Sequence, residues 1–366
     1  MPEAAGRTRA FRAPGRVNLI GDHTDYEEGF VLPLALDLEC VVRSRPRGDG
    51  IVRVRSEQAD GAVELPADGS AEPQGAQGWG RYAAGVLRAL AERGRPDAGM
   101  DATVSSNVPA GAGLSSSAAL EVALALALCD AAAFALPPVE LALACREAEQ
   151  AATGVPCGIM DQLASVAGRR DCALLIDCRS LAVEPVPLPA ELAVLAVDSR
   201  VARALVDSAY AERREACAAA ARRLGLRALR DARSEQVADD PRARHVVAEN
   251  ARVVEAAGAL ARGDGERLGR LLSASHASLR EDFEVSTPEL DALVRALEEA
   301  GALGARLTGA GFGGSVVAVA PAAEAERILE AAARSYETET GLRPLGRVCR
   351  AVDGAGPLDP GERRSE

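Results

Sequence analysis

Residues 109–119 read PAGAGLSSSAA, and we start from this stretch because two glycines and three serines lead into the most apolar run of the chain. Gly111 and Gly113 can adopt positive φ and let the backbone approach a ligand closely. From Leu114 onward we expect a helix whose first N–H groups lack internal partners and whose dipole favours an anion.

A single serine is enough to cap a helix, so three consecutive serines leave two hydroxyls without a capping role. The stretch is either a capped turn before a core helix or an anion site of backbone amides and hydroxyls, with one serine facing a Mg²⁺ ion. A second glycine-rich loop, TGAGFGG at 308–314, lies between two apolar stretches and is by itself equally typical of a hairpin turn. Together, the two loops favour the anion site.

Composition limits the class of partner. The chain has 366 residues, of which 48% are hydrophobic, as expected for a globular protein of two domains or one large one. Its formal net charge is −12, which argues against binding to nucleic acid or to an anionic membrane. All 42 basic residues are arginine, so the phosphate-binding lysines of Walker-type NTPases and protein kinases are excluded.

Cysteine usage and the terminal sequence predict a cytoplasmic protein. The eight cysteines show no Cys-x-x-Cys spacing, and we expect reduced, mostly buried thiols. Residues 1–16 lack the apolar core of a signal peptide. The apolar run 118–136 is interrupted by Glu121 and Asp130, which is typical of a buried helix and not of a membrane span.

Hydrophobic periodicity predicts both strands and helices. The expected elements are a hairpin over 30–56 with its turn at RPRGDG, a helix over 79–90, a strand near 100–104, a helix of about 20 residues after the serines, a helix over 138–152, strands at 172–177 and 192–198, helices from 200 to 300, strands on both sides of the second glycine loop, a helix over 322–336 and a last strand near 343–352.

Two finer expectations concern a helix start and the domain boundary. Ser286 and Glu289 predict a capping box, with Pro288 in the first helical turn. The first part of the chain is richer in strands and the second in helices, so we divide it into an N-terminal domain, residues 1–195, and a C-terminal domain, residues 196–366.

Two further segments carry polar residues suited to chemistry. In APGRVNLIGDHTDY (13–26), Asp22, His23 and Asp25 follow a short apolar strand; such a loop is often merely solvated, but these groups can also hold the hydroxyls of a polyol. In GVPCGIMDQLAS (154–165), Asp161 stands among apolar residues, where aspartate is commonly a helix cap or a salt-bridge partner. A neighbouring arginine would keep it ionised, as a base at neutral pH requires.

These segments together resemble the galactokinases, a family of the GHMP small-molecule kinases, and the resemblance covers nearly the whole chain. The similar motifs are GRVNLIGDHTDY (15–26), VPAGAGLSSSAALEVA (108–123), LTGAGFGGSVVAV (307–319), PCGIMDQ (156–162), AYAERREAC (209–217), ARHVVAEN (243–250) and SLREDFEVSTPELD (278–291). The resemblance implies an α+β, two-domain GHMP kinase fold with the active site in the interdomain cleft.

The resemblance also implies an activity, namely ATP- and Mg²⁺-dependent phosphorylation of galactose at its C1 hydroxyl. Asp161 would be the base facing that hydroxyl, and Arg16 would stabilise the transferring phosphoryl group or keep Asp161 ionised. The implied sugar-binding residues are Asp22, His23, Thr24, Asp25, Gly158 and Tyr210. The implied nucleotide-binding residues are Gly111, Ala112, Gly113, Leu114, Ser115, Ser116 and Ser117 around the phosphates, with Ser56 and Trp79 near the adenine. Ser117 and Glu149 would hold Mg²⁺, since Glu149 precedes Asp161 by twelve residues, as the family's metal-binding glutamate does.

Departures from the family pattern leave the sugar open. The signature normally has glutamate where Asp22 stands, Glu27 and Glu28 replace an asparagine and its neighbour, and residues 198–205 lack a histidine often seen there. Another sugar, such as arabinose, galacturonate or N-acetylgalactosamine, is therefore an alternative. A third alternative is a sugar- and ATP-binding sensor without turnover, although the galactokinase relatives that act as sensors are damaged in the serine-alanine segment that is unbroken here. We expect a monomer or weak homo-oligomer with galactose and ATP as partners.

Overall fold

The computed structural model describes residues 7–202 and 206–358. Its strands are β1 (Arg9–Asn18), β2 (Phe30–Val31), β3 (Pro33–Arg47), β4 (Ile51–Ser56), β5 (Ala59–Pro66), β6 (Gly99–Ser106), β7 (Cys172–Asp177), β8 (Ala182–Pro187), β9 (Leu192–Asp198), β10 (Gly304–Thr308), β11 (Ser315–Pro321), β12 (Leu345–Cys349) and β13 (Gly356–Leu358). Its α-helices are α1 (Gly80–Ala91), α2 (Ser116–Ala131), α3 (Pro138–Thr153), α4 (Met160–Ala167), α5 (Val206–Arg223), α6 (Pro241–Ala261), α7 (Gly265–Glu281), α8 (Pro288–Glu299) and α9 (Ala325–Thr340).

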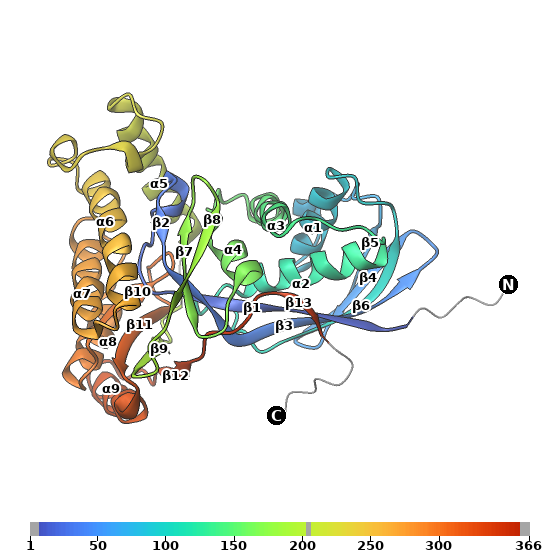
Figure 1. The fold of residues 1–366 in the computed structure, drawn as a ribbon. Coiled ribbons are helices and arrows are strands. Elements are labelled where there is room, and N and C mark those ends of the chain that lie inside the picture. Colours follow the sequence, from blue (N-terminus) through green and yellow to red (C-terminus); the bar gives the residue numbers. More distant parts are fainter. Residues whose placement is uncertain (1–6, 203–205, 359–366) are drawn as a thin grey trace.

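The first part of the chain forms a mixed sheet of six strands in the order β13-β1-β3-β6-β4-β5. Helices α1 to α4 lie over one face of this sheet, with α2 packed directly against β1 and β3 (Figure 1). Residues buried along α2 lie on all sides of the helix, which explains why its sequence is apolar all round. The loop of serines therefore begins a helix that is anchored in the core.

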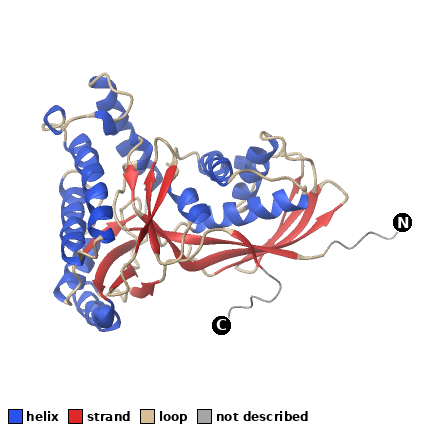
Figure 2. Ribbon diagram, in the orientation of Figure 1, coloured by secondary structure: helices blue, strands red, loops and turns tan. Residues whose placement is uncertain are grey.

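The second part forms an antiparallel sheet in the order β10-β11-β9-β12, and helices α6 to α9 lie at this end of the molecule (Figures 1 and 2). A small sheet, β2-β7-β8, lies between the two parts. Strand β13, although last in the described chain, pairs with β1 in the first sheet. The mixed α+β architecture is confirmed, whereas the domain boundary near residue 195 stays a prediction.

Hydrogen bonds join the two parts at their glycine loops. The Ser315 hydroxyl donates to the Ala112 carbonyl at 2.6 Å, so the second glycine loop is tied to the first. The Thr308 hydroxyl donates to the carbonyl of Asn18, at the end of β1, at 3.0 Å. Both contacts are buried, and they bring segments far apart in sequence to one place.

The predicted hairpin over 30–56 is wrong, although both of its strands exist. Strand β6 lies between them, antiparallel to β3 and parallel to β4. Asp101 of β6 forms ion pairs with Arg45 and Arg47 of β3, which favour β6 as the neighbour of β3. Strand β5, which pairs with β4, was not expected, because it is mostly exposed and carries few apolar residues.

The predicted capping box is also wrong, by one residue. Pro288 occupies the first helical position of α8, so Thr287 is the N-cap, and its side chain accepts a hydrogen bond from Leu290 N–H. The Ser286 hydroxyl instead donates to Asp291 at 2.6 Å.

Other sequence expectations agree with the structure. The helices and strands expected at 79–90, 100–104, 138–152, 172–177, 192–198 and beside the second glycine loop are present. The helix after the serines and the last strand are shorter than expected, and the last helix is shifted by a few residues. Of the helical stretch expected from 200, residues 203–205 lie outside the described chain. All eight cysteines are free thiols, and no helix of the described segments combines the length and apolarity that crossing a membrane requires.

Candidate active site

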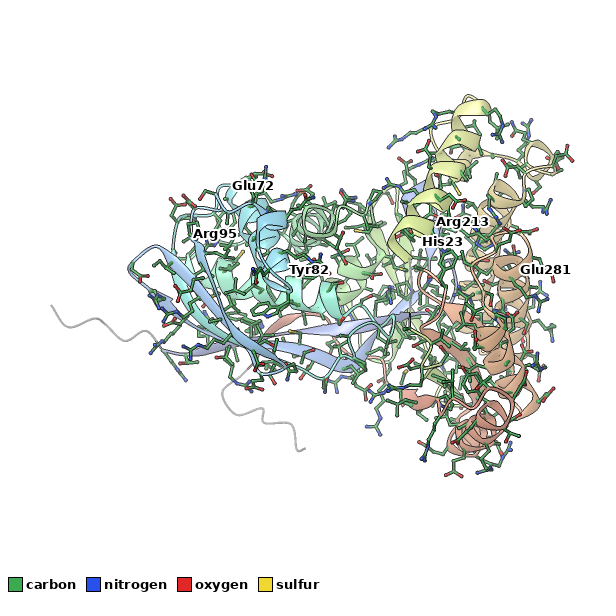
Figure 3. The ribbon with its side chains drawn as sticks, turned by 180° about the vertical axis from the view of Figure 1, so that it is seen from behind. His23, Glu72, Tyr82, Arg95, Arg213 and Glu281 are labelled. Atoms are coloured by element: carbon green, nitrogen blue, oxygen red, sulfur yellow. The ribbon has the colours of Figure 1, made fainter. Side chains whose placement is uncertain are left out.

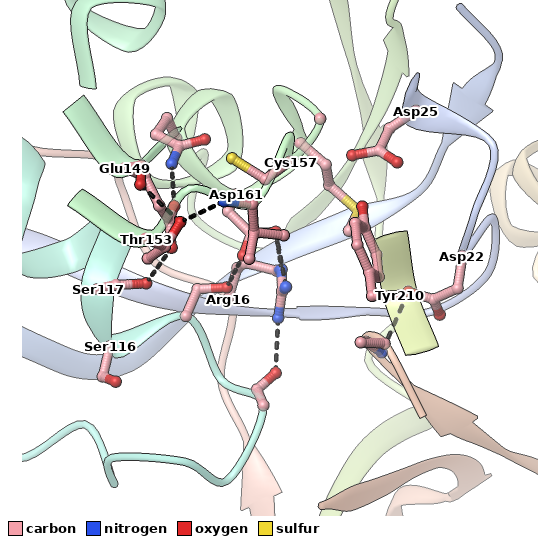
Figure 4. A pocket seen from close by; sticks show the side chains of 18 of the residues that line it. Arg16, Asp22, Asp25, Ser116, Ser117, Glu149, Thr153, Cys157, Asp161 and Tyr210 are labelled. Atoms are coloured by element: carbon pink, nitrogen blue, oxygen red, sulfur yellow. Dashed lines mark hydrogen bonds and ion pairs between the residues drawn. The ribbon is translucent and has the colours of Figure 1, made fainter. Parts of the chain in front are cut away.

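A cleft of about 420 Å³ opens between helices α1 to α4 and the second glycine loop (residues 308–314) (Figure 4). Most of the residues singled out from the sequence line it. These are Arg16, Asp22, His23, Asp25, Gly111, Gly113, Ser115, Ser116, Ser117, Glu149, Gly158, Asp161 and Tyr210. The fold therefore brings segments from five separate regions of the chain to one cavity.

Arg16 and Asp161 form the centre of the cleft. A register shift in β1 between Pro14 and Arg16 interrupts the pairing with β3 where the arginine side chain leaves the strand. Arg16 Nε donates to Asp161 Oδ1 at 2.8 Å, and Nη2 lies 2.6 Å from the same oxygen. The arginine is almost fully buried, whereas about a quarter of the Asp161 side chain, 27%, stays exposed to the cleft. Buried Arg16 thus holds Asp161 on the protein side, while Asp161 stays accessible from the cleft.

The first glycine loop adds a second contact to Asp161. Gly111 and Gly113 have positive φ, 77° and 81°, and Arg16 Nη1 donates to the Gly113 carbonyl at 2.7 Å. Ser115 also has a left-handed backbone, φ 58°, and caps no helical N–H with its side chain. Its hydroxyl instead donates to Asp161 Oδ2 at 2.5 Å. Both oxygens of Asp161 are therefore positioned before any substrate is present.

Ser117 and Glu149 meet on the other side of the loop (Figure 4). The Ser117 hydroxyl donates to Glu149 Oε1 at 2.7 Å, and Gln162 Nε2 donates to Glu149 Oε2 at 2.6 Å. Burial, together with the charge of Asp161, raises the pKa of Glu149 to about 7. A carboxylate in this environment gains from any cation bound beside it.

Asp25 and Gly158 form the opposite end of the cleft. A Cβ on Gly158 would lie 1.7 Å from Oδ2 of Asp25, so only glycine allows the carboxylate to occupy this place. Burial, with a contribution from the nearby charge of Asp161, raises the pKa of Asp25 to about 6. Oxygens of this kind suit the donors of a polyhydroxylated ligand.

His23 and Tyr210 belong to an aromatic cluster around that end. The Nδ1 atom of His23 lies 3.0 Å from the hydroxyl of Tyr26, and the His23 ring lies 5.6 Å from the ring of Tyr210 between centroids. Burial lowers the pKa of His23 to about 3, so its imidazole is neutral at ordinary pH. The ring of Phe283 completes the cluster, with its centroid 4.5 Å from that of the His23 ring.

Five residues implied by the resemblance do not line the cleft: Thr24, Ala112, Leu114, Ser56 and Trp79. The Thr24 hydroxyl lies within hydrogen-bond distance of the Gly21 and Phe30 carbonyls and so holds the loop that carries its neighbours. Ala112 and Leu114 contribute backbone carbonyls, which accept from Ser315 and from Arg16 N–H.

Ser56 and Trp79, the two residues expected near the adenine, lie outside this cavity. The Ser56 hydroxyl accepts from Gln58 N–H at 3.2 Å, and Trp79 packs against the main hydrophobic core. Tyr82, one turn further along α1 than Trp79, lines the cleft instead, on the side away from His23 (Figure 3).

Several lining residues were missed by sequence reasoning: Tyr82, Thr153, Val155, Cys157, Met160 and Gln162. Gly309 and Ala310, which also line the cleft, belong to the second glycine loop that the sequence had singled out. Gln162 and Glu121 had a detectable signal, since each is polar within an apolar helix. Glu121 is fully buried, its Oε2 accepts from Gln162 Nε2 at 3.3 Å, and burial raises its pKa well above the ordinary value. Gln162 thus links a core carboxyl to Glu149.

The acidic pair Glu27 and Glu28 adds little free charge to the cleft. Glu27 is buried and accepts from Leu229 N–H at 2.8 Å. Glu28 forms ion pairs with Arg179 and Arg227. Neither side chain lines the cavity, so the argument for a different sugar that rested on this pair loses its physical basis.

Comparison with known proteins places the chain in a family. Residues 81–169 match the GHMP kinases N terminal domain, residues 256–338 match the GHMP kinases C terminal domain, and residues 3–46 match the galactokinase galactose-binding signature. A galactokinase of Roseiflexus sp. (strain RS-1) is 46% identical over 370 residues, which cover 97% of this chain and 94% of that protein. The chain belongs to the galactokinases of the GHMP kinase family.

Solved structures agree with the galactokinase assignment. Lactococcus lactis galactokinase, solved as a complex with galactose, superposes with a TM-score of 0.91 at 33% identity and covers 96% of this chain and 95% of that one. Mevalonate kinase of L. major, solved with R-mevalonate, has a TM-score of 0.67 at 19% identity over 96% of this chain and 98% of that one. The second likeness shows that the two proteins share a fold.

Proposed function

We propose that this protein is a galactokinase that transfers the γ-phosphoryl group of ATP to the anomeric C1 hydroxyl of galactose. The observation that carries the proposal is the position of Asp161, which is accessible from the cleft and bonded to both Arg16 and Ser115 of the first glycine loop. An acceptor-activating carboxylate beside a phosphate-binding loop is the arrangement that phosphoryl transfer needs.

The roles we assign follow from these contacts. Asp161 accepts or orients the proton of the C1 hydroxyl, while Arg16 stays bonded to it and stabilises charge on the transferring group. Asp25, His23, Gly158 and Tyr210 form the sugar end, and the amides and hydroxyls of residues 111–117 contact the nucleotide phosphates at the N-terminus of α2. Catalysis on this scheme is mostly positioning and charge stabilisation.

The residues present fit a Mg²⁺ ion. Ser117 Oγ and Glu149 Oε1 lie 2.7 Å apart, and a hydroxyl and a carboxylate are oxygen ligands of the kind that Mg²⁺ prefers. No cluster of three or more His, Cys, Asp or Glu side chains that could hold a metal occurs in the described segments, so phosphate oxygens and water would complete the coordination. When bound, Mg²⁺ would neutralise negative charge on the nucleotide phosphates.

The substitution Asp161→Asn tests the assigned base. It removes the acceptor for the proton but keeps the size of the side chain, so we expect galactose phosphate formation to be lost while galactose binding stays measurable by calorimetry. Turnover above about a tenth of the unaltered rate would contradict a catalytic role, since general-base catalysis typically contributes a hundredfold or more.

The substitution Ser117→Ala tests the metal ligand. We expect the KM for Mg·ATP to rise at least about tenfold, because a ligand oxygen beside Glu149 is lost, while the galactose dissociation constant stays within about twofold. Ser116→Ala is the matched comparison, because Ser116 lines the same cleft but makes no contact with Glu149 among the described residues. Equal effects of the two substitutions on Mg·ATP would remove Ser117 from the metal site.

A different sugar remains the second candidate, because Asp22 stands where the galactokinase signature normally has glutamate. A panel of sugars assayed for coupled ATP consumption tests it, and a kcat/KM higher for a rival sugar than for galactose would decide against galactose. We further propose that the enzyme acts in the cytoplasm as a monomer or weak homo-oligomer without nucleic-acid or membrane partners, and gel filtration tests the oligomeric state.

A further inference from the structure

Asp22 lines the cleft, but both of its carboxylate oxygens are engaged by the protein itself. Its Oδ1 accepts from Gly309 N–H at 3.1 Å, and its Oδ2 forms an ion pair with Nη2 of Arg306. Only 3% of the Asp22 side chain is exposed. Both oxygens of the Asp22 carboxylate therefore make their strong polar contacts with protein groups and not with the cavity.

Arg306 comes from the other part of the molecule and is completely buried on β10. Its Nη1 donates to the Leu19 carbonyl at 3.1 Å and lies 3.4 Å from that of Asn18, so the guanidinium also holds the end of β1. Among the described residues, Asp22 supplies its only salt bridge. A buried guanidinium without this carboxylate would carry an uncompensated charge, so each partner requires the other.

The pair connects the two loops that form the sugar end of the cleft. Asp22 belongs to the loop of residues 21–25, which carries His23 and Asp25, while Gly309 begins the second glycine loop. Gly309 and Ala310 line the same cavity as His23. The Asp22 carboxylate thus links the 21–25 loop directly to the second glycine loop, through Gly309, and to the strand before that loop, through Arg306.

We propose that Asp22 and Arg306 are positioning residues that set the separation of the 21–25 loop and the second glycine loop, and thereby determine how tightly the sugar is held, without donating to or accepting from a sugar hydroxyl. This inference rests on the proposed galactokinase function. It assigns the shorter aspartate, together with the fully buried Arg306, which no sequence motif singled out, to the spacing of the two loops.

Deoxy sugars separate loop positioning from direct contact. The variants are Asp22→Asn, Asp22→Glu and Arg306→Lys, assayed with galactose and with its 2-deoxy, 4-deoxy and 6-deoxy analogues. We expect each variant to raise the KM of all four sugars by a common factor of about ten, because the Asp22–Arg306 pair positions the whole sugar end of the cleft and contacts no single hydroxyl. We expect kcat and the KM for ATP to stay within about twofold.

Each contrary outcome identifies a different error. If Asp22 accepts a bond from one hydroxyl, its substitution will cost nothing with the sugar that lacks that hydroxyl, and the inference is overturned. A loss confined to kcat, with unchanged KM for every sugar, points to a smaller folded fraction and also overturns it. If Asp22→Asn does not fold, Asp22→Glu keeps the charge of the pair and gives the same comparison.

The control is Asp177→Asn, which neutralises a carboxylate of an ion pair with Arg230 outside the cleft and should leave every sugar KM unchanged. Absence of galactose turnover by the unaltered protein would overturn the proposed function and this inference with it. Turnover by the unaltered protein, combined with a loss specific to one hydroxyl in the variants, would overturn the inference alone.

Discussion

The carboxylate of Asp161 receives its partners from two different elements, Arg16 from β1 and Ser115 from the loop before α2. Its place therefore depends on the sheet and on the phosphate loop at the same time. Ser115 has a left-handed backbone that serine adopts at some cost, and its hydroxyl bonds to Asp161 and not to the helix. The strained backbone of Ser115 thus orients the carboxylate to which we assign the role of base.

If Asp25 binds the sugar as proposed, we expect galactose binding to depend on pH. Its pKa of about 6 means that it loses its proton between pH 5 and 7, and an ionised carboxylate is the better acceptor for sugar hydroxyls. We expect galactose, in the absence of nucleotide, to bind roughly tenfold more tightly at pH 7 than at pH 5, because about nine-tenths of Asp25 is ionised at pH 7 and about one-tenth at pH 5. Calorimetric titration over this range measures it.

The variant Asp25→Asn should bind more weakly and without this dependence on pH. A slope that persists in the variant would assign the titration to another group. The sign of the linkage to folding is opposite: a carboxyl whose folded pKa is raised stabilises the ligand-free protein below its unfolded pKa of about 4, and this contribution is lost as the pH rises through about 6.

At the residue level, the sequence identified the side chains of the site better than it identified the residues that they contact. Asp161, Arg16, Ser117 and Glu149 were expected together, and the cleft contains all four. The role of Arg306 could not be expected, because its partner Asp22 lies far away in sequence and ion-pair geometry leaves no periodic signal. Polar residues in apolar helices, such as Gln162, are visible in sequence, but only the fold shows what they contact.

Both ends of helix α2 help to position the site. Its N-terminus carries the serines, and its last turn is held by Arg95, which is 3% exposed. Arg95 donates to the carbonyls of Leu128, Ala67 and Ala98 at 2.9, 3.2 and 2.7 Å. A single guanidinium therefore satisfies three backbone acceptors and fixes the far end of the helix.

The substitution Arg95→Ala should lower the free energy of unfolding by about 3 kcal/mol, since it removes the side-chain donor of three backbone carbonyls and the packing of a buried guanidinium. Urea denaturation followed by circular dichroism measures the change. Arg88→Ala, in α1, is the matched control, because 43% of the Arg88 side chain is exposed and its ion pairs are with the well-exposed Glu72 and Glu92. A similar loss from both variants would show that Arg95 has no special role.

At the level of elements, strand and helix positions were predictable but strand pairing was not. Alternating apolar residues marked both β3 and β4, yet nothing in that alternation shows that β6 lies between them. The pairing is decided by contacts distant in sequence, such as those of Asp101 with Arg45 and Arg47. Strand β5 gave no signal because most of its side chains are exposed.

At the scale of the whole molecule, the end of the described chain returns to support the site. Backbone N–H groups of Val352, Gly354 and Ala355 donate to the carbonyls of Ala35, Gly168 and Ser165 at 3.1, 2.8 and 2.9 Å. Ser165 and Gly168 lie at the end of α4, the helix that begins beside Asp161. The return of the chain therefore holds the end of the helix that carries Asp161, the proposed base.

Gly354→Ala tests this return. A Cβ at residue 354 would lie 2.2 Å from the Val166 carbonyl oxygen, so the segment must move away from α4. We expect a loss of about 2 kcal/mol in unfolding free energy and a lower kcat, measured by urea denaturation and steady-state assay. Gly356→Ala is the control, because its Cβ would have no atom within 4 Å. Unchanged stability in Gly354→Ala would show that the segment adapts freely.

The pairing of β13 with β1 also determines when, during synthesis, this edge of the first sheet can be completed. Strand β1 leaves the ribosome among the first described residues, whereas its neighbour on that edge spans 356–358 and is among the last. Until residues 356–358 have been made, the backbone groups of β1 at Ala10–Arg12 are therefore open to pairing with another nascent chain. Synthesis of β13, and not the closing of the first sheet around α2, is therefore the event that covers this edge.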